Sequence, residues 1–153
     1  MAASCTELCD PWSSPDGQQQ TRVDREKTCP MLIRVFPSEG RHHSLASYQD
    51  GQTPVSEIHL YSWMDATLDE LSKCLARLMP DVASDGTHLV FARVFPDKRP
   101  ESEPGSYAMK EVGVVCCGVA GLDDGKTLAQ ANFCPGDFLD VAVLPGRRPR
   151  YSY

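Results

Sequence analysis

Five apolar stretches along the chain have the two-residue period, or the short apolar run, that is typical of β-strands. They lie at residues 31–36 (MLIRVF), 58–63 (IHLYSW), 87–95 (THLVFARVF), 109–116 (MKEVGVVC) and 137–144 (DFLDVAVL). Between the second and third stretches the period changes, because Leu68, Leu71, Leu75 and Leu78 recur at helical spacing. The pattern therefore predicts five strands and one main helix.

The ends of this helix are marked in the sequence. Thr67 and Glu70 have the spacing of a capping box, which satisfies two orphan amides at a helix start. Pro80 disfavours helical angles in the residue before it, so we expect the helix to end at Met79. A short helical turn is expected at residues 127–128. The element order predicts an α+β fold of the β-grasp type, in which one helix packs across a mixed sheet whose first and last strands lie parallel in the centre.

The length of 153 residues suits one domain with short tails, and the 41% of apolar residues suffices for a packed core. Residues 1–23 are predicted to be a disordered N-terminal tail, because they are rich in Ser, Pro, Gly and Gln, with Trp12 as the one large anchor. Residues 24–145 form the predicted domain. Residues 146–153 form a short basic tail that cannot continue a strand past Pro149.

The net charge narrows the classes of partner. A charge of −6 and a pI near 5.1 disfavour nonspecific capture of nucleic acid or an anionic membrane, because both require a cationic surface. The arginines at 147, 148 and 150 are expected to make at most an auxiliary RNA contact. No apolar run is long enough to span a bilayer and no signal peptide is recognisable, which predicts a soluble intracellular protein with protein partners.

The polar and sulfur-containing residues give no pattern for metal binding or catalysis. The seven cysteines form no C-x-x-C pair and include the adjacent Cys116 and Cys117, which is unsuited to a disulfide framework and predicts reduced thiols. His42 and His43 are neighbours in a polar loop, where we expect them to point apart into solvent. Cys74 is expected to be a small buried residue of the helix. No G-x-S-x-G or phosphate-binding glycine loop occurs, so we expect no enzyme, no metal and no cofactor.

Strand alternation sorts the predicted sheet into two faces. The face toward the helix is expected to hold Met31, Ile33, Val35, Ile58, Leu60, Leu139, Val141 and Val143. The opposite face would hold Leu32 and His88 together with the predicted partner-binding residues Arg34, Phe36, His59, Tyr61, Trp63, Val90, Phe138 and Asp140. Arg34 and Asp140 are expected to pair across adjacent strands. An exposed apolar face of this kind favours partner binding. The alternative is that the loops at 38–55 and 96–106 fold over the face and bury it as a second small core.

Several long runs carry a family resemblance that covers residues 24–145. They are DREKTCPMLIRVF, GRHH, SEIHLYSWMDATLDEL, GTHLVFARVF, DDGKTL and GDFLDVAVLP. Together they resemble the eighteen-kilodalton Sin-associated polypeptide family. The sequence departs from this family at the N-terminal tail, and at residues 114–120, which are apolar here where the family tends to be polar and basic.

The resemblance implies a ubiquitin-like fold and a non-enzymatic adaptor in the Sin histone-deacetylase corepressor complex. It also implies a place in the ASAP assembly, with Acinus and an RNA-binding protein carrying a serine-rich domain, which modulates splicing at exon junctions. We therefore expect a nuclear protein with some cytoplasmic population. A conjugated ubiquitin-like modifier is the alternative, and it is disfavoured because Gly146 is followed by Arg147 and Arg148 rather than by a second glycine.

Overall fold

The computed structural model describes residues 22–80 and 84–146 of the chain. The elements in chain order are the strand β1 (Met31–Glu39), the 3₁₀-helix η1 (Leu45–Gly51), the strand β2 (Ile58–Ser62), the helix α2 (Leu68–Leu78) and the strands β3 (His88–Pro96), β4 (Tyr107–Cys116) and β5 (Phe138–Leu144). The five predicted strands and the main helix are thus confirmed.

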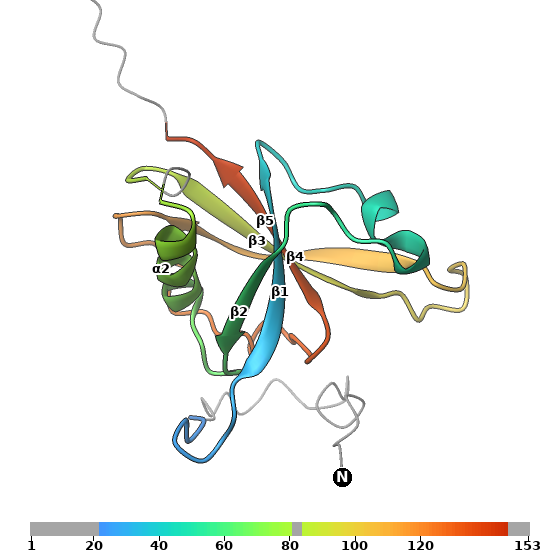
Figure 1. The fold of residues 1–153 in the computed structure, drawn as a ribbon, viewed down its shortest axis with the longest axis horizontal. Helices are drawn as coiled ribbons and strands as arrows, with labels where there is room; N and C mark the ends of the chain where they lie inside the picture. The colour runs from blue at the N-terminus through green and yellow to red at the C-terminus, as the bar shows by residue number, and fades with distance from the viewer. Residues whose placement is uncertain (1–21, 81–83, 147–153) are drawn as a thin grey trace, which may run out of the picture.

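The strands form one mixed sheet in the order β2-β1-β5-β3-β4. β1 and β5 pair in parallel at its centre, whereas the other neighbouring pairs are antiparallel. In Figure 1, α2 packs on one side of the sheet, and the long β1–β2 loop with η1 lies away from the helix. This α+β arrangement is the β-grasp of ubiquitin-like domains, as predicted.

The helix begins and ends where its sequence signals predict. The Thr67 hydroxyl accepts a hydrogen bond from the Glu70 N–H at 3.2 Å, which satisfies one free amide of the first turn. Met79 is the C-cap residue, directly before Pro80. Leu68, Leu71 and Leu75 are fully buried, whereas Leu78 is 55% exposed, because it falls beyond the end of the packed stripe.

The main core lies between α2 and the face of the sheet that we call the inner face. Six of the residues predicted to face the helix belong to this core, and two more, Met31 and Ile58, pack against it while partly buried. The six are Ile33, Val35, Leu60, Leu139, Val141 and Val143. The alternation of side chains along the strands therefore predicted the inner face correctly.

Two elements differ from their expected bounds for physical reasons. β1 continues past Pro37 to Glu39, and over these last residues it pairs with β5 but no longer with β2. A proline lacks the N–H that a second neighbouring strand would need, so it is tolerated there. The helix η1 was not predicted, since its sequence LASYQDG has no apolar period and buries one residue, Tyr48.

The segment before β5 ties the start of α2 to β4, the edge strand. The Leu68 N–H donates to the Lys126 carbonyl at 2.9 Å. Lys126 Nζ donates to the carbonyl of Val112 at 2.6 Å, beside an irregularity in the β3–β4 register. The predicted helical turn is present, because the Ala131 N–H donates to the Thr127 carbonyl at 3.1 Å.

The predicted tails and the predicted reduced state of the cysteines are the remaining expectations about the chain. Residues 1–21 and 147–153, which hold most of the two predicted tails, lie outside the described residues. Cys29, Cys74, Cys116 and Cys117 are free thiols, whereas Cys134 is disulfide-bonded, so the expectation of reduced thiols is wrong for that residue. Within residues 22–80 and 84–146, no helix has the length and apolar character to cross a lipid bilayer.

Candidate interaction surface

The outer face of the sheet, opposite α2, is divided into a covered part and an open part. The β1–β2 loop folds over the covered part and inserts Tyr48 between the strands' side chains. The result is a second core of Phe36, Tyr48 and Val94, with Tyr107, Met109 and Phe138 packed against it. Tyr48 packs edge-on against Phe36 and stacks with Phe138, at centroid distances of 5.5 and 5.6 Å. For this part of the face, the alternative of a second small core is correct for the loop at 38–55, whereas the loop at 96–106 contributes no residue to that core.

Asp140 on β5 holds the loop in place. His42 Nδ1 lies 2.8 Å from Oδ1 of Asp140, and His43 Nδ1 lies 2.8 Å from Oδ2. The Tyr48 hydroxyl donates to the same Oδ2. Because an ionised carboxylate only accepts hydrogen bonds, both histidine rings donate through Nδ1. The expectation that His42 and His43 point apart into solvent is therefore wrong, since one buried carboxylate holds both rings.

The pKa values of the buried carboxylate and of Tyr48 are both shifted. Burial raises the pKa of Asp140, but the hydrogen bonds from His42, Tyr48 and His43 together outweigh burial and hold it below its usual value. Burial also raises the pKa of Tyr48, and its hydrogen bond to Asp140 raises it further. The loop is thus held by three side chains that donate to one ionised acceptor.

Two of the predicted surface residues are consequently not at the surface. Phe36 and Asp140 are both fully buried, because the loop covers them. Phe138 and Val90 are partly buried. The expected pair of Arg34 with Asp140 is also wrong, since His42, His43 and Tyr48 take the Asp140 oxygens and Arg34 binds another carboxylate.

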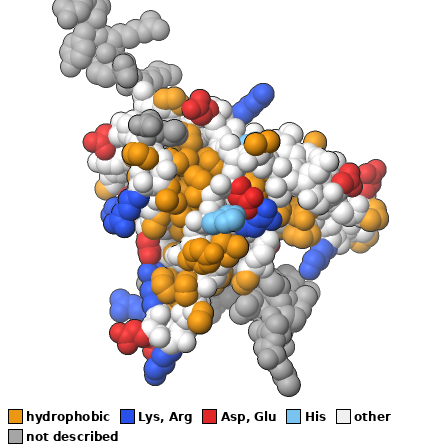
Figure 2. Space-filling view, viewed as in Figure 1, with side chains coloured by type: hydrophobic (Ala, Val, Ile, Leu, Met, Phe, Trp, Pro, Cys, Tyr) orange, Lys and Arg blue, Asp and Glu red, His pale blue; other side chains and the backbone are white. Residues whose placement is uncertain are grey.

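We call the uncovered part, on β1, β2 and the residue just before β2, the open face. It consists of Leu32, Arg34, Glu57, His59 and Tyr61. The strand register places Leu32 opposite Tyr61 and Arg34 opposite His59. Tyr61 is 67% exposed and Leu32 is 40% exposed, and the His59 side chain is 54% exposed. Figure 2 shows one side of the molecule, where hydrophobic side chains gather around a histidine with acidic and basic side chains beside it.

Glu57 organises the polar half of the open face. Its carboxylate binds the Arg34 guanidinium through two hydrogen bonds, one of them from Nη2 at 3.1 Å, and lies 2.8 Å from His59 Nε2. The Arg34 guanidinium is the main cause that lowers the pKa of Glu57 to about 2, and His59 adds to it. The guanidinium also lies over the rings of Phe138 and Phe36, at 5.1 and 5.6 Å. Arg34 therefore joins the open face to the second core.

Trp63 lies just beyond β2 and is partly exposed. Its Nε1 donates to the Thr28 carbonyl at 2.7 Å, and the Arg25 guanidinium lies 4.7 Å from the ring centroid. Arg25 in turn binds Asp65 and Glu70. Trp63 thus anchors the segment before β1.

Glu57 and Tyr48 are the residues of this region that sequence reasoning missed. Glu57 has the spacing that could have revealed it, because positions 57, 59 and 61 alternate onto one face. Tyr48 carried no such signal. In the part of the chain that the structure describes, no three His, Cys, Asp or Glu side chains are grouped to hold a metal ion. The arrangement offers binding through an exposed tyrosine and a charged network.

Comparison with known proteins agrees with the fold. The chain matches the family described as Sin3 associated polypeptide p18 (SAP18) over residues 22–143. It is 48% identical to a Drosophila melanogaster protein named histone deacetylase complex subunit SAP18, over 85% of this chain and 84% of that one. It is 45% identical to the human protein of the same name, over 82% of this chain and 80% of that one. An Arabidopsis thaliana protein of that name is 39% identical over 79% of this chain and 78% of that one. On these matches, which span nearly all of the described residues, the chain belongs to the SAP18 family.

Proposed function

We propose that the chain is a non-enzymatic adaptor subunit of a nuclear histone deacetylase corepressor complex and acts in transcriptional repression. The observation that carries the proposal is family membership, with identities of 48% and 45% to relatives that are named as subunits of such a complex. A Sin corepressor and a histone deacetylase are its expected partners. It binds them through a surface that is complementary to theirs and catalyses no reaction itself.

The open face is the docking surface that we assign to this role. Tyrosine and arginine are enriched among the residues that contribute most to binding energy, and both are present there, next to Leu32. The Glu57 bridge holds Arg34 and His59 in place before a partner arrives, which lowers the entropy cost of binding. Trp63 lies just beyond the end of β2. Phe36 and Phe138 pack against the Arg34 guanidinium, whereas Asp140 binds the β1–β2 loop and Val90 lies on β3, apart from the open face.

A second assembly belongs to the proposal. The family resemblance supports a role in the ASAP complex, in which an Acinus-like protein and an RNA-binding protein with a serine-rich domain are partners and splicing at exon junctions is the process affected. At 16.9 kDa the chain is small enough to diffuse through nuclear pores, so retention on partners accounts for nuclear residence with a remaining cytoplasmic population.

Affinity purification of the tagged full chain, with mass spectrometry and a deacetylase assay, tests the proposal. We expect a Sin3 homologue and an active deacetylase in the wild-type eluate. Tyr61→Ala should reduce their recovery strongly, as for a residue worth about 2 kcal/mol or more, because it removes the exposed ring. Leu78→Ala, which changes an exposed residue of α2, is the matched control and should leave recovery unchanged.

The same experiment separates the alternatives. An eluate without deacetylase refutes the corepressor role, and one without an Acinus-like protein refutes the splicing role. Normal recovery with Tyr61→Ala moves the docking surface away from the open face. Covalent conjugates of the chain, seen in intact masses, would favour the modifier alternative.

A further inference from the structure

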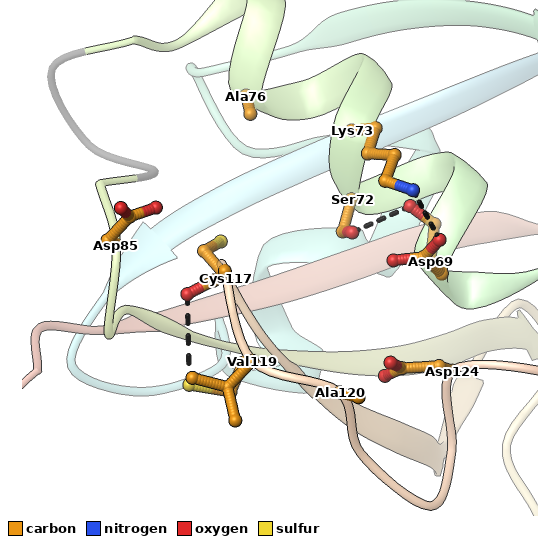
Figure 3. Close-up of a pocket in the computed structure, with 11 residues that line it drawn as sticks. Asp69, Ser72, Lys73, Ala76, Asp85, Cys117, Val119, Ala120 and Asp124 are labelled. Atoms are coloured by element: carbon orange, nitrogen blue, oxygen red, sulfur yellow. Dashed lines mark hydrogen bonds and ion pairs between the residues drawn. The ribbon is translucent and has the colours of Figure 1, made fainter.

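A pocket lies on the other side of the molecule from the open face, between α2 and the turn that follows β4. Its volume is about 430 Å³. Figure 3 shows Ser72 and Lys73 of α2 on one side, and Cys117, Val119 and Ala120 of the turn on the other. Asp85, which precedes β3, lies at one end, and Asp124 lies toward the other end. Asp85 and Asp124 therefore lie on opposite sides of the pocket in this view.

The charges of the pocket do not cancel. Asp69 and Lys73 pair with each other at 2.8 Å. Asp85 and Asp124 remain, and neither forms an ion pair within residues 22–80 and 84–146. Oδ2 of Asp124 accepts from the Gly121 N–H at 2.9 Å, but its Oδ1 is buried and has no hydrogen-bond partner. A buried acceptor without a partner is destabilising, so a small side-chain rotation that brings the Asp124 carboxylate to a donor in the pocket would be favourable.

Part of the wall between these carboxylates is apolar. Ala76, Val119 and Ala120 line this part, and Val119 is 59% exposed. Burial raises the pKa of the Cys117 thiol, and Cys116 and Asp85 raise it further, which argues against a reactive thiolate. An apolar wall with a carboxylate at its end matches a side chain that has an aliphatic stem and a cationic head.

We propose that this pocket binds an extended basic peptide segment of a partner protein, with one arginine side chain directed to Asp85 and another to Asp124. The guanidinium group has several donors in a fixed geometry, so it can pair with a carboxylate through two hydrogen bonds once the Asp124 side chain has turned toward it. Anionic or purely apolar segments would leave both carboxylates without partners. This site is separate from the open face and does not depend on the corepressor assignment.

The test uses the purified full chain and a fluorescein-labelled peptide, Ala-Val-Arg-Val-Arg-Ala, in which both arginines fall on one side of an extended backbone. Fluorescence anisotropy should show saturable binding. A peptide with citrulline in place of both arginines keeps the shape and loses the charge, and it should not bind. Asp85→Asn and Asp124→Asn should each weaken binding about tenfold or more, since each removes a charge-assisted contact. Glu101→Gln, a loss of the same charge on an exposed loop, should leave it unchanged.

A variant that is expected to strengthen peptide binding keeps the test decisive if the Asp124 variant folds poorly. Lys73→Gln removes the competing cation from an exposed helix position and should tighten binding. Equal binding of the citrulline peptide, or no change with Asp85→Asn and Lys73→Gln, overturns the proposal.

The chain's own basic residues could occupy the pocket in place of a partner peptide. Arg147, Arg148 and Arg150 lie outside the described residues, but Gly146 lies against Gly86, next to Asp85. If changing all three arginines to glutamine greatly tightens peptide binding, the pocket serves the chain's own tail, and the partner assignment is overturned. Unchanged binding supports it.

Discussion

The hydroxyl of Tyr48 donates a hydrogen bond to Oδ2 of Asp140 across 2.5 Å, and both side chains are fully buried. This contact joins η1 to the last strand of the sheet. It covers the centre of the outer face and leaves β2 and the neighbouring half of β1 available. The position of the open face therefore depends on a loop that binds elsewhere on the same sheet.

Replacing Tyr48 by phenylalanine keeps the ring packing and removes the donor. Hydrogen bonds to charged groups contribute about 1.5–3 kcal/mol, so Tyr48→Phe should lower the free energy of unfolding by about that amount in urea titrations. Tyr61→Phe, at an exposed position, should change it by less than about 0.5 kcal/mol. Equal stability of the two variants would contradict a structural role for the Tyr48 hydroxyl.

Acid should weaken the fold through Asp140. Its pKa in the folded protein is below the usual value of about 3.9, so the folded state favours the ionised form. The resulting stability is present above the unfolded-state pKa and is lost as pH falls through the folded-state pKa. Urea midpoints of wild type and Asp140→Asn should differ most near pH 6 and converge as pH falls below about 4. A constant difference across that range would rule out this linkage.

Two leucines of α2 provide a paired test of the main core. Leu75→Ala leaves a cavity under the helix and should cost about 2–5 kcal/mol of unfolding free energy, because Leu75 is fully buried. Leu78→Ala, one helical turn later and 55% exposed, should cost less than about 1 kcal/mol. Thermal or urea unfolding measures both, and a large loss with Leu78→Ala would show that the packed stripe extends further than described.

Trp63→Phe tests the anchoring of the segment before β1. The change keeps an aromatic ring beside Arg25 but removes the hydrogen bond to the Thr28 carbonyl, which should cost about 1 kcal/mol. Hydrogen exchange should become faster at the Thr28 amide, which donates to Asp24. His59→Ala, on the neighbouring strand β2, should leave that exchange rate unchanged. If Trp63→Phe also leaves it unchanged, the tryptophan is not the anchor of this segment.

The fold could be predicted from local signals, and the covered face could not. The leucine spacing of α2, the Thr67 cap and the inward positions such as Ile33 and Val141 are all set by residues close in sequence. The packing of the β1–β2 loop depends instead on contacts such as Tyr48 with Asp140, which lie 92 positions apart. A polar loop without an apolar period gives no indication of which strand it will meet.

The same limit applies to the charged network. Arg34 and Asp140 were expected to pair because both were assigned to the outer face of adjacent strands, and the assignment of the face was correct. The choice of partner was decided by competition: two histidines and a tyrosine reach Asp140 from the loop, and Glu57 lies on the β2 side of Arg34. Strand alternation indicates which residues share a face but not which of them bind each other.

The parallel pairing of β1 with β5 has a consequence for biosynthesis. Arg34 is opposite Phe138 in the register, so the centre of the sheet is closed by residues about a hundred positions apart. Contacts of such long sequence separation slow folding, because a large loop must close before they form. A nascent chain that has been synthesised only as far as β4 lacks β5, the strand that pairs with β1 at the centre of the sheet. Its apolar strands are then exposed to other proteins. The domain is therefore expected to fold late in translation, and to depend on chaperones until Phe138–Leu144 has emerged.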